Sequence, residues 1–71
     1  MMNEPSAAAV VDARGMRCPW PALRLSRAMR AESEVLLLAD DPQAAREIAA
    51  LAAQHDWTVE TAGEGCWRVA R

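Results

Sequence analysis

The sequence contains no lysine, phenylalanine or tyrosine, and three tryptophans are its only aromatic residues. Hydrophobic residues make up 52% of the 71, but sixteen of them are alanine, so the core must be thin. A chain of this length forms one small domain. Ligand pockets typically enclose roughly 300–1,000 Å³, and a chain this short has too few residues to enclose such a cavity by itself. We therefore expect a shallow site, or a site that a partner completes.

Lysine is missing from the basic residues, all eight of which are arginine, and the formal net charge is −2. A slightly acidic domain is a poor candidate for binding nucleic acid by charge alone. The net charge nevertheless hides a local basic region, because five arginines fall close together: Arg14, Arg17, Arg24, Arg27 and Arg30.

Long hydrophobic runs are also absent, since the longest run of large apolar residues, 35–38, is far too short to span a bilayer. The first residues carry an acid and a proline where a secretory signal peptide has a basic and then an apolar stretch. We therefore expect a cytoplasmic protein without membrane contact. Its two cysteines, Cys18 and Cys66, are then expected to be reduced thiols. Two distant cysteines and one histidine supply too few metal ligands, so we expect no metal and no other cofactor.

The hydrophobic pattern predicts six elements in the order β-α-β-α-β-β. Residues 1–7 read as a loose polar tail and residues 8–71 as a single domain. Strands are expected at 8–12, 35–39, 57–61 and 66–70, and helices at 19–31 and 42–55. Two helices cover only one face of four strands well. The sequence therefore predicts a two-layer α/β sandwich, with a four-stranded mixed sheet and both helices on one face.

Three apolar faces are expected to form the core. The first helix should bury a stripe that begins just before it: Cys18, Ala22, Leu25 and Met29. The second helix should bury a face of small residues around one isoleucine: Ala45, Ile48, Ala49 and Ala52. The last two strands should form a hairpin with one apolar face: Trp57, Val59, Trp67 and Val69.

The segment around Cys18 is the candidate for chemistry. A thiol just before a helix is close to free backbone N–H groups and to the partial positive charge of the helix start, which lower a thiol pKa. Arg17 is adjacent and adds positive charge. Pro19 and Pro21 are tolerated in a first helical turn, and they stiffen the backbone that aims the sulfur. These residues predict a reactive thiol.

Other residues have plainer interpretations. Cys18 itself could be a small apolar core residue, because free cysteines are often buried. Cys66 could pair with Cys18 as a resolving thiol, but nothing in the sequence brings the two together, and it is more typical of a passive strand cysteine. His55 is typical of a residue at a helix C-terminus, where it interacts with the helix dipole. Asp40 or Asp41 is expected to cap the second helix.

Residues 12–21 carry the pattern Asp-x-x-Gly-x-x-Cys-Pro-x-Pro, which resembles that of the TusA/SirA-like sulfur-carrier family. The likeness extends over 10–71 and includes the stretches 38–42 and 46–48 and the closing hairpin. It implies the same two-layer sandwich and a carrier of sulfane sulfur, rather than a stand-alone turnover enzyme. The family often has a polar residue between the two prolines, and Trp20 stands there instead, which changes the docking surface beside the sulfur.

The resemblance implies that Cys18 accepts sulfur as a persulfide from a donor protein, such as a cysteine desulfurase or a rhodanese-like protein. Cys18 would relay it to an acceptor protein, for example in tRNA thiolation or sulfur metabolism. Arg17, Pro19 and Pro21 are the expected supporting residues. We expect a monomer or weak dimer that does not bind nucleic acid directly.

Two other classes of function stay open. The domain could be a non-catalytic binding or regulatory module in which Cys18 is structural. It could also be a nucleic-acid-binding domain of similar layout, although the acidic charge and the missing lysine disfavour this. The state of Cys18 separates the carrier from the structural alternative. A carrier is expected to have an accessible thiol with a lowered pKa, whereas a structural cysteine should resist alkylating reagents until the protein unfolds.

Overall fold

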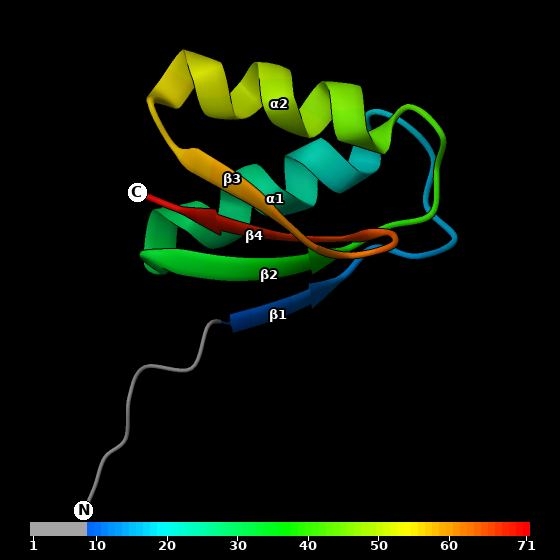
Figure 1. Ribbon diagram of the computed structural model, residues 1–71, viewed down its shortest axis with the longest axis horizontal. Helices are drawn as coiled ribbons and strands as arrows, with labels where there is room; N and C mark the ends of the chain where they lie inside the picture. Colours follow the sequence, from blue (N-terminus) through cyan, green and yellow to red (C-terminus); the bar gives the residue numbers. More distant parts are fainter. Residues whose placement is uncertain (1–8) are drawn as a thin grey trace, which may run out of the picture.

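The structure is a computed structural model that describes residues 9–71. The order of its elements is the predicted one (Figure 1). The expected strand residue Ala8 and the expected tail of residues 1–7 lie outside the described residues. In chain order the elements are β1 (Ala9–Asp12), α1 (Trp20–Ala31), β2 (Glu34–Leu38), α2 (Ala44–His55), β3 (Thr58–Gly63) and β4 (Cys66–Ala70).

The four strands form one mixed sheet in the order β1-β2-β4-β3. β1 runs parallel to β2, and the other two pairs are antiparallel. Strand β2 lies inside the sheet, where its continuous apolar run belongs, and its Val35 and Leu37 are fully buried. Residues of both helices share a single core with them, including Leu25 of α1 and Ile48 of α2. The predicted two-layer sandwich is therefore confirmed (Figure 1).

Helix α1 buries a stripe that begins later than predicted. Its buried residues are Pro21, Leu25 and Met29, whereas Cys18 is exposed. The helix starts only at Trp20, so Cys18 precedes the first turn and does not share the helical spacing of the stripe. The interpretation of Cys18 as a core residue is wrong for this reason.

Helix α2 is rotated relative to the prediction. It begins at Ala44 and buries Ala44, Ile48 and Ala52, while Ala45 and Ala49 are exposed. An alanine-rich helix offers several stripes of similar hydrophobicity, so the sequence alone does not choose between them. In the described part of the chain, neither helix is long and apolar enough to cross a membrane.

The hairpin of β3 and β4 is longer than predicted. Strand β3 continues through an irregularity at Thr61 and Gly63, which leaves only Glu64 and Gly65 between the strands. The predicted apolar face is confirmed, because all four of its residues belong to the core or pack against it: Trp57, Val59, Trp67 and Val69.

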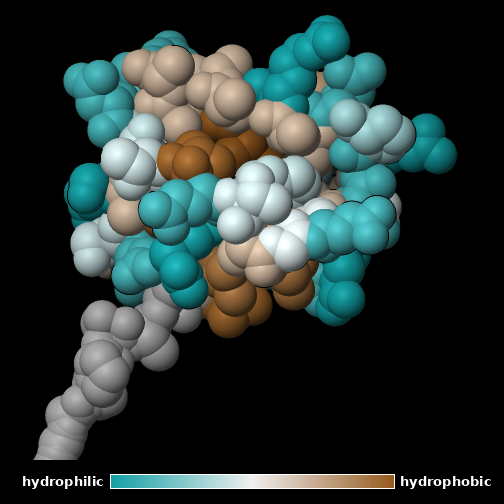
Figure 2. Space-filling view, viewed as in Figure 1, coloured by the Kyte–Doolittle hydropathy of each residue, from teal (hydrophilic) through white to brown (hydrophobic). Residues whose placement is uncertain are grey.

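The surface seen in Figure 2 is largely polar. Hydrophobic side chains appear there along the line where α2 meets the strands, and again at the edge where β1 lies. Val10 of β1 is 63% exposed. The side of the sheet away from the helices therefore keeps some apolar surface.

Candidate functional site

Cys18 lies in the loop that joins β1 to α1, directly before Pro19, the N-cap residue of the helix. Its side chain is exposed, and it is a free thiol. The backbone N–H of Cys18 donates a hydrogen bond to Asp41 Oδ2, in the loop that follows β2. The two loops meet because β1 and β2 are parallel neighbours whose carboxyl ends lie at the same edge of the sheet. The backbone that carries the sulfur is therefore held from outside its own loop.

Two consecutive carboxylates tie these loops together. Asp40 Oδ1 accepts a hydrogen bond from the Gly15 N–H at 2.9 Å. Asp41 accepts from Cys18 through Oδ2, and through Oδ1 it accepts from the Gln43 N–H at 2.9 Å, just before α2. The expectation that Asp40 or Asp41 caps α2 is wrong, because the helix begins later: its N-cap residue is Gln43, which has no side-chain cap bond, and at this end of the helix Asp41 bonds only the N–H of Gln43 itself. The longer-range role of both carboxylates was not predicted.

The two prolines of the motif have different surroundings. Pro21 is among the largest fully buried side chains and anchors the start of α1 in the core. Pro19 is exposed, follows a cis peptide bond, and its carbonyl accepts a hydrogen bond from the Leu23 N–H at 3.1 Å. The Trp20 N–H donates to the Arg17 carbonyl at 2.8 Å. Cys18 is therefore carried on backbone that is bonded on both sides.

The pKa of the Cys18 thiol is raised, which corrects the expectation of a lowered value. The main cause is the Glu47 carboxylate of α2, which interacts with the protonated thiol as a hydrogen-bond acceptor. Partial desolvation and the negative charges of Glu47 and Asp41 raise the pKa further. The prediction considered only the helix start and neighbouring arginines, whereas α2 brings a carboxylate to the sulfur from another element.

Arg17 acts on Asp41 rather than directly on the thiol. The pKa of Asp41 is lowered, first by the hydrogen bond from the Gln43 N–H and then by the one from the Cys18 N–H. The positive charge of Arg17 adds to this effect. Arg17 therefore favours the ionised carboxylate that holds the loop, while the expected direct stabilisation of a thiolate by Arg17 is not among the causes that shift the Cys18 pKa.

An ion pair closes the beginning of the same loop. The Arg14 guanidinium donates two hydrogen bonds to the Asp12 carboxylate, from Nε at 2.9 Å and from Nη2 at 2.8 Å. This pairing lowers the pKa of Asp12 to about 2. Arg14 therefore pairs with a residue only two positions away, and the pair stabilises the chain where β1 ends.

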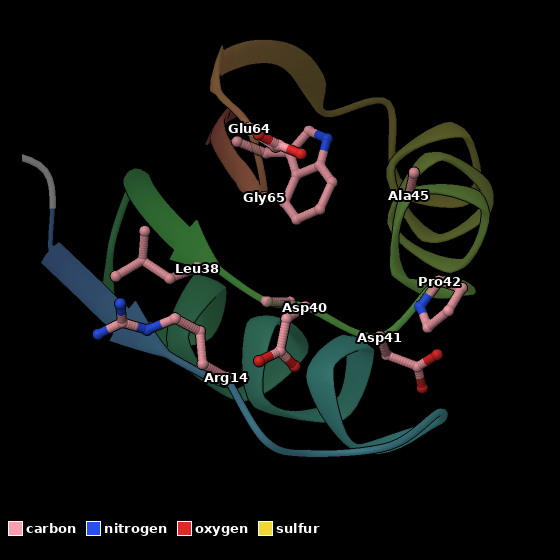
Figure 3. Close-up of a pocket in the computed structure, with 10 residues that line it drawn as sticks. Arg14, Leu38, Asp40, Asp41, Pro42, Ala45, Glu64 and Gly65 are labelled. Carbon is pink, nitrogen blue, oxygen red and sulfur yellow. The ribbon is translucent and has the colours of Figure 1, made fainter.

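Two shallow hollows flank the pair of aspartates, and both are open to solvent. One has a volume of about 470 Å³ and lies against the cysteine loop. The other has a volume of about 540 Å³ and lies between the hairpin turn and the start of α2. Figure 3 shows residues from both sides of this second hollow: Arg14, Asp40, Pro42, Ala45, Glu64 and Gly65. Cys18 lines neither of the two, so its sulfur is presented on the surface, as expected for a shallow site.

Residues 9–70 match the model of the sulfurtransferase TusA family. The chain belongs to this family. No protein in a search of curated proteins matches it. Membership establishes a general role in sulfur transfer and implies proteins that donate and accept the sulfur. The match covers every strand and helix described above, so the sulfurtransferase TusA fold and the described domain coincide.

Two further candidate residues of this TusA-family domain belong to other elements. Cys66 is a free, half-buried thiol at the start of β4, opposite Leu38 of β2. His55 lies in the last turn of α2, as predicted, and its ring stacks on Trp57 with 4.5 Å between centroids. Within residues 9–71, no three side chains of the metal-ligating types gather as a metal site.

Sequence reasoning missed one residue beside the sulfur of this TusA-family protein. Glu47 belongs to the stretch 46–48, which carried part of the family resemblance, but no role was assigned to it. The sequence feature that could have identified Glu47 is its position, directly before the buried Ile48 on an alanine-rich helix. That position places the carboxylate at the border of the packed face, from which it acts on the pKa of the Cys18 thiol.

Proposed function

We propose that this chain is a persulfide carrier in which Cys18 receives sulfane sulfur from a donor protein and delivers it to an acceptor protein. The observation that carries the proposal is the presentation of Cys18. The thiol is exposed on a loop whose backbone is held by Asp41 and by the buried Pro21. A carrier needs its sulfur accessible to two partners in turn, and an open site serves this better than a closed pocket.

The proposed transfer consists of two exchange steps between sulfur atoms. In the loading step, the Cys18 thiolate attacks the outer sulfur of a donor persulfide, a new S–S bond forms on Cys18, and the donor cysteine leaves as a thiolate. In the delivery step, an acceptor thiolate attacks the outer sulfur on Cys18, which leaves as a thiolate. Each step breaks one S–S bond and forms another, so the transfer needs no external oxidant.

The raised pKa of Cys18 affects the loading step. The thiolate is the nucleophile, and the carboxylate of Glu47 favours the protonated thiol in the free protein. The complex with the donor must therefore shift this balance toward the thiolate. Such a carrier reacts slowly with small electrophiles while it is alone.

The alternative of a binding module with a structural Cys18 has less support. Cys18 lies outside the core cluster and is exposed, so its side chain adds little to packing. We place the relay in the cytoplasm, where thiols stay reduced, as a monomer or weak dimer. The acceptor decides whether the sulfur enters tRNA thiolation or another sulfur pathway.

The test is intact-protein mass spectrometry after incubation with a cysteine desulfurase and cysteine. The wild type and Cys66→Ser should gain the mass of one sulfur atom, in a form that reductant removes, and Cys18→Ser should not. Cys66→Ser is the matched control because it removes the other thiol. Equal gain by Cys18→Ser contradicts the proposal, and so does a failure of all three proteins to gain sulfur from this donor and from a rhodanese.

A further inference from the structure

The outward face of α1 carries a groove of about 280 Å³, here called the α1 groove. Two of its residues, Trp20 and Leu23, are 59% and 50% exposed, and they are among the three most exposed large hydrophobic residues of the described chain. They lie three residues apart, so they are neighbours on one helix face. The lining residues are Trp20, Leu23, Arg24, Ser26, Arg27 and Arg30.

This apolar surface is not explained by packing within the domain. Helix α1 contributes a different stripe to the core, which includes Leu25 and Met29. A tryptophan left in water is a frequent anchor in protein interfaces, because covering it removes a large apolar area from solvent while its indole N–H can still find a partner. Trp20 and Leu23 therefore have the exposure of contact residues.

The same groove is positively charged. Arg24, Arg27 and Arg30 line it, while the ion pairs found within residues 9–71 involve Arg14 and Arg68 instead. Arg24 makes one weak contact, from Nη1 to the Met16 Sδ at 3.9 Å. Three guanidinium groups are therefore available beside the apolar pair, on a chain whose net charge is −2. Charge complementarity calls for a partner surface that carries carboxylates.

The groove begins two residues after Cys18. Trp20 is the first residue of α1, two positions after Cys18, and its N–H bonds back to the Arg17 carbonyl. A partner that covers Trp20 is therefore placed beside the exposed sulfur. In the loading step Cys18 is the nucleophile, so a donor that covers Trp20 presents its persulfide beside the sulfur that must attack it.

We propose that the α1 groove docks an acidic segment of the protein that donates sulfur to Cys18. An apolar side chain of that segment lies on Trp20 and Leu23, and its carboxylates pair with the three arginines of the groove. This inference rests on the proposed carrier function and adds the chemistry by which the donor is recognised.

RNA fits the groove less well than an acidic protein does. Leu23 has no donor or positive charge with which to bind a phosphate. The negative charges of Asp41 and Glu47 near Cys18 repel the phosphates of an RNA. The protein has no lysine, which RNA-binding surfaces commonly use. Binding of RNA is therefore treated as an outcome that contradicts the proposal.

The first experiment compares two sulfur sources for the same proteins. Trp20→Ser and Arg27→Glu are loaded from a cysteine desulfurase with cysteine, and separately from inorganic polysulfide, and the rate is followed by intact mass. Loading from the protein donor should slow at least tenfold, whereas loading from polysulfide should stay as in the wild type. Loading of the wild type from the protein donor should also slow as ionic strength rises, because the charges are exposed.

Two variants serve as matched controls. Val10→Ser removes an equally exposed apolar side chain from β1, and Arg46→Glu makes the same charge change on α2. Both should load like the wild type from either source. Equal slowing of controls and groove variants, or no slowing of the groove variants, overturns the docking proposal while loading from polysulfide still supports the carrier. Absence of sulfur on Cys18 from both sources overturns the carrier function itself.

A second experiment uses synthetic probes on the isotope-labelled protein. A helical peptide of glutamate and leucine should shift the NMR signals of Trp20, Leu23 and Arg27 and inhibit loading from the desulfurase, while its lysine-for-glutamate version should do neither. Shifts confined to other faces contradict the proposal. Equally strong binding of a single-stranded RNA to the α1 groove also contradicts it.

Discussion

At the scale of single residues, the reactivity of Cys18 depends on which charges reach its sulfur. The helix start and Arg17 are close in sequence, but Glu47 of α2 and Asp41 act on the thiol and raise its pKa. A raised pKa is compatible with sulfur transfer in a protein of this family, because a protonated thiol reacts slowly with oxidants and other electrophiles before the donor binds.

Replacing Glu47 tests this account of the thiol. Glu47→Gln removes the negative charge and the carboxylate acceptor, so the pKa of Cys18 should fall, and alkylation by iodoacetamide near neutral pH should become faster. The measurement is the pH dependence of the alkylation rate in a Cys66→Ser background. Glu64→Gln, in the exposed hairpin turn, is the control and should leave the profile unchanged. A slower reaction of Glu47→Gln would contradict the assignment.

Two glycines provide a second test at the residue scale. Gly65 has φ +66° and a Cβ built there would lie 2.8 Å from the Ala39 carbonyl oxygen, whereas Gly15 has φ +84° with open space around it. Both alanine variants adopt an unfavourable backbone, which costs about 1–2 kcal/mol, but only Gly65→Ala must also displace backbone. Urea unfolding should therefore show a larger loss for Gly65→Ala than for Gly15→Ala. A larger loss for Gly15→Ala would contradict this expectation and would mean that the backbone of the hairpin turn moves at little cost in free energy.

At the scale of elements, the connection between the cysteine loop and α2 depends on Asp41. Its carboxylate accepts one backbone N–H from each side, from Cys18 and from Gln43. One ionised side chain therefore positions the thiol and the start of the helix together. The chemistry of the loop and the stability of α2 are coupled at this point.

This coupling predicts a particular dependence on pH. The pKa of Asp41 is lowered in the folded protein, so its stabilising effect is complete above the ordinary value near 3.8 and is lost as pH falls through the lowered folded pKa. Asp41→Ala should therefore destabilise the protein at pH 7 and lose less additional stability on acidification than the wild type. Urea unfolding at neutral and acidic pH measures both. Parallel losses in the two proteins would contradict the role of Asp41.

At the scale of the whole molecule, one small core supports an open site. A domain of this size has little stability to spare, since folded proteins are stable by only about 5–15 kcal/mol and small domains lie at the low end. The core combines Leu25 and Met29 of α1, Ile48 of α2, and Leu37 of β2. The α1 groove lies outside it, so docking residues and core residues can be changed separately.

A pair of leucine variants tests this separation. Leu37 is fully buried in β2, whereas Leu23 is half exposed on α1. Leu37→Ala should lower the free energy of unfolding by about 2–5 kcal/mol, because it leaves a cavity. Leu23→Ala should change it by no more than about 0.5 kcal/mol, as for other exposed positions. Similar losses, measured by urea unfolding, would mean that Leu23 belongs to the core.

Much of the fold was predictable because it depends on local patterns. Alternation along the last two strands placed Val59 and Val69 on the buried face, and the continuous run at 35–38 identified the buried strand. The choice between Ala44 and Ala45 on α2 was not predictable, because alanines on both sides make its stripes nearly equal in hydrophobicity. Contact with the sheet decides it.

The sequence by itself determined the order of the elements, the two layers and the position of Cys18 before a helix, because these follow from periodicity, proline positions and motif spacing. Only the tertiary structure decided that the Cys18 N–H is hydrogen-bonded to Asp41, 23 positions away, and that Glu47 raises the pKa of its thiol. Such contacts depend on how parallel strands align their loops and how α2 packs beside α1. Charge and hydrogen bonding act through space, so the state of the thiol follows from the packing of distant elements.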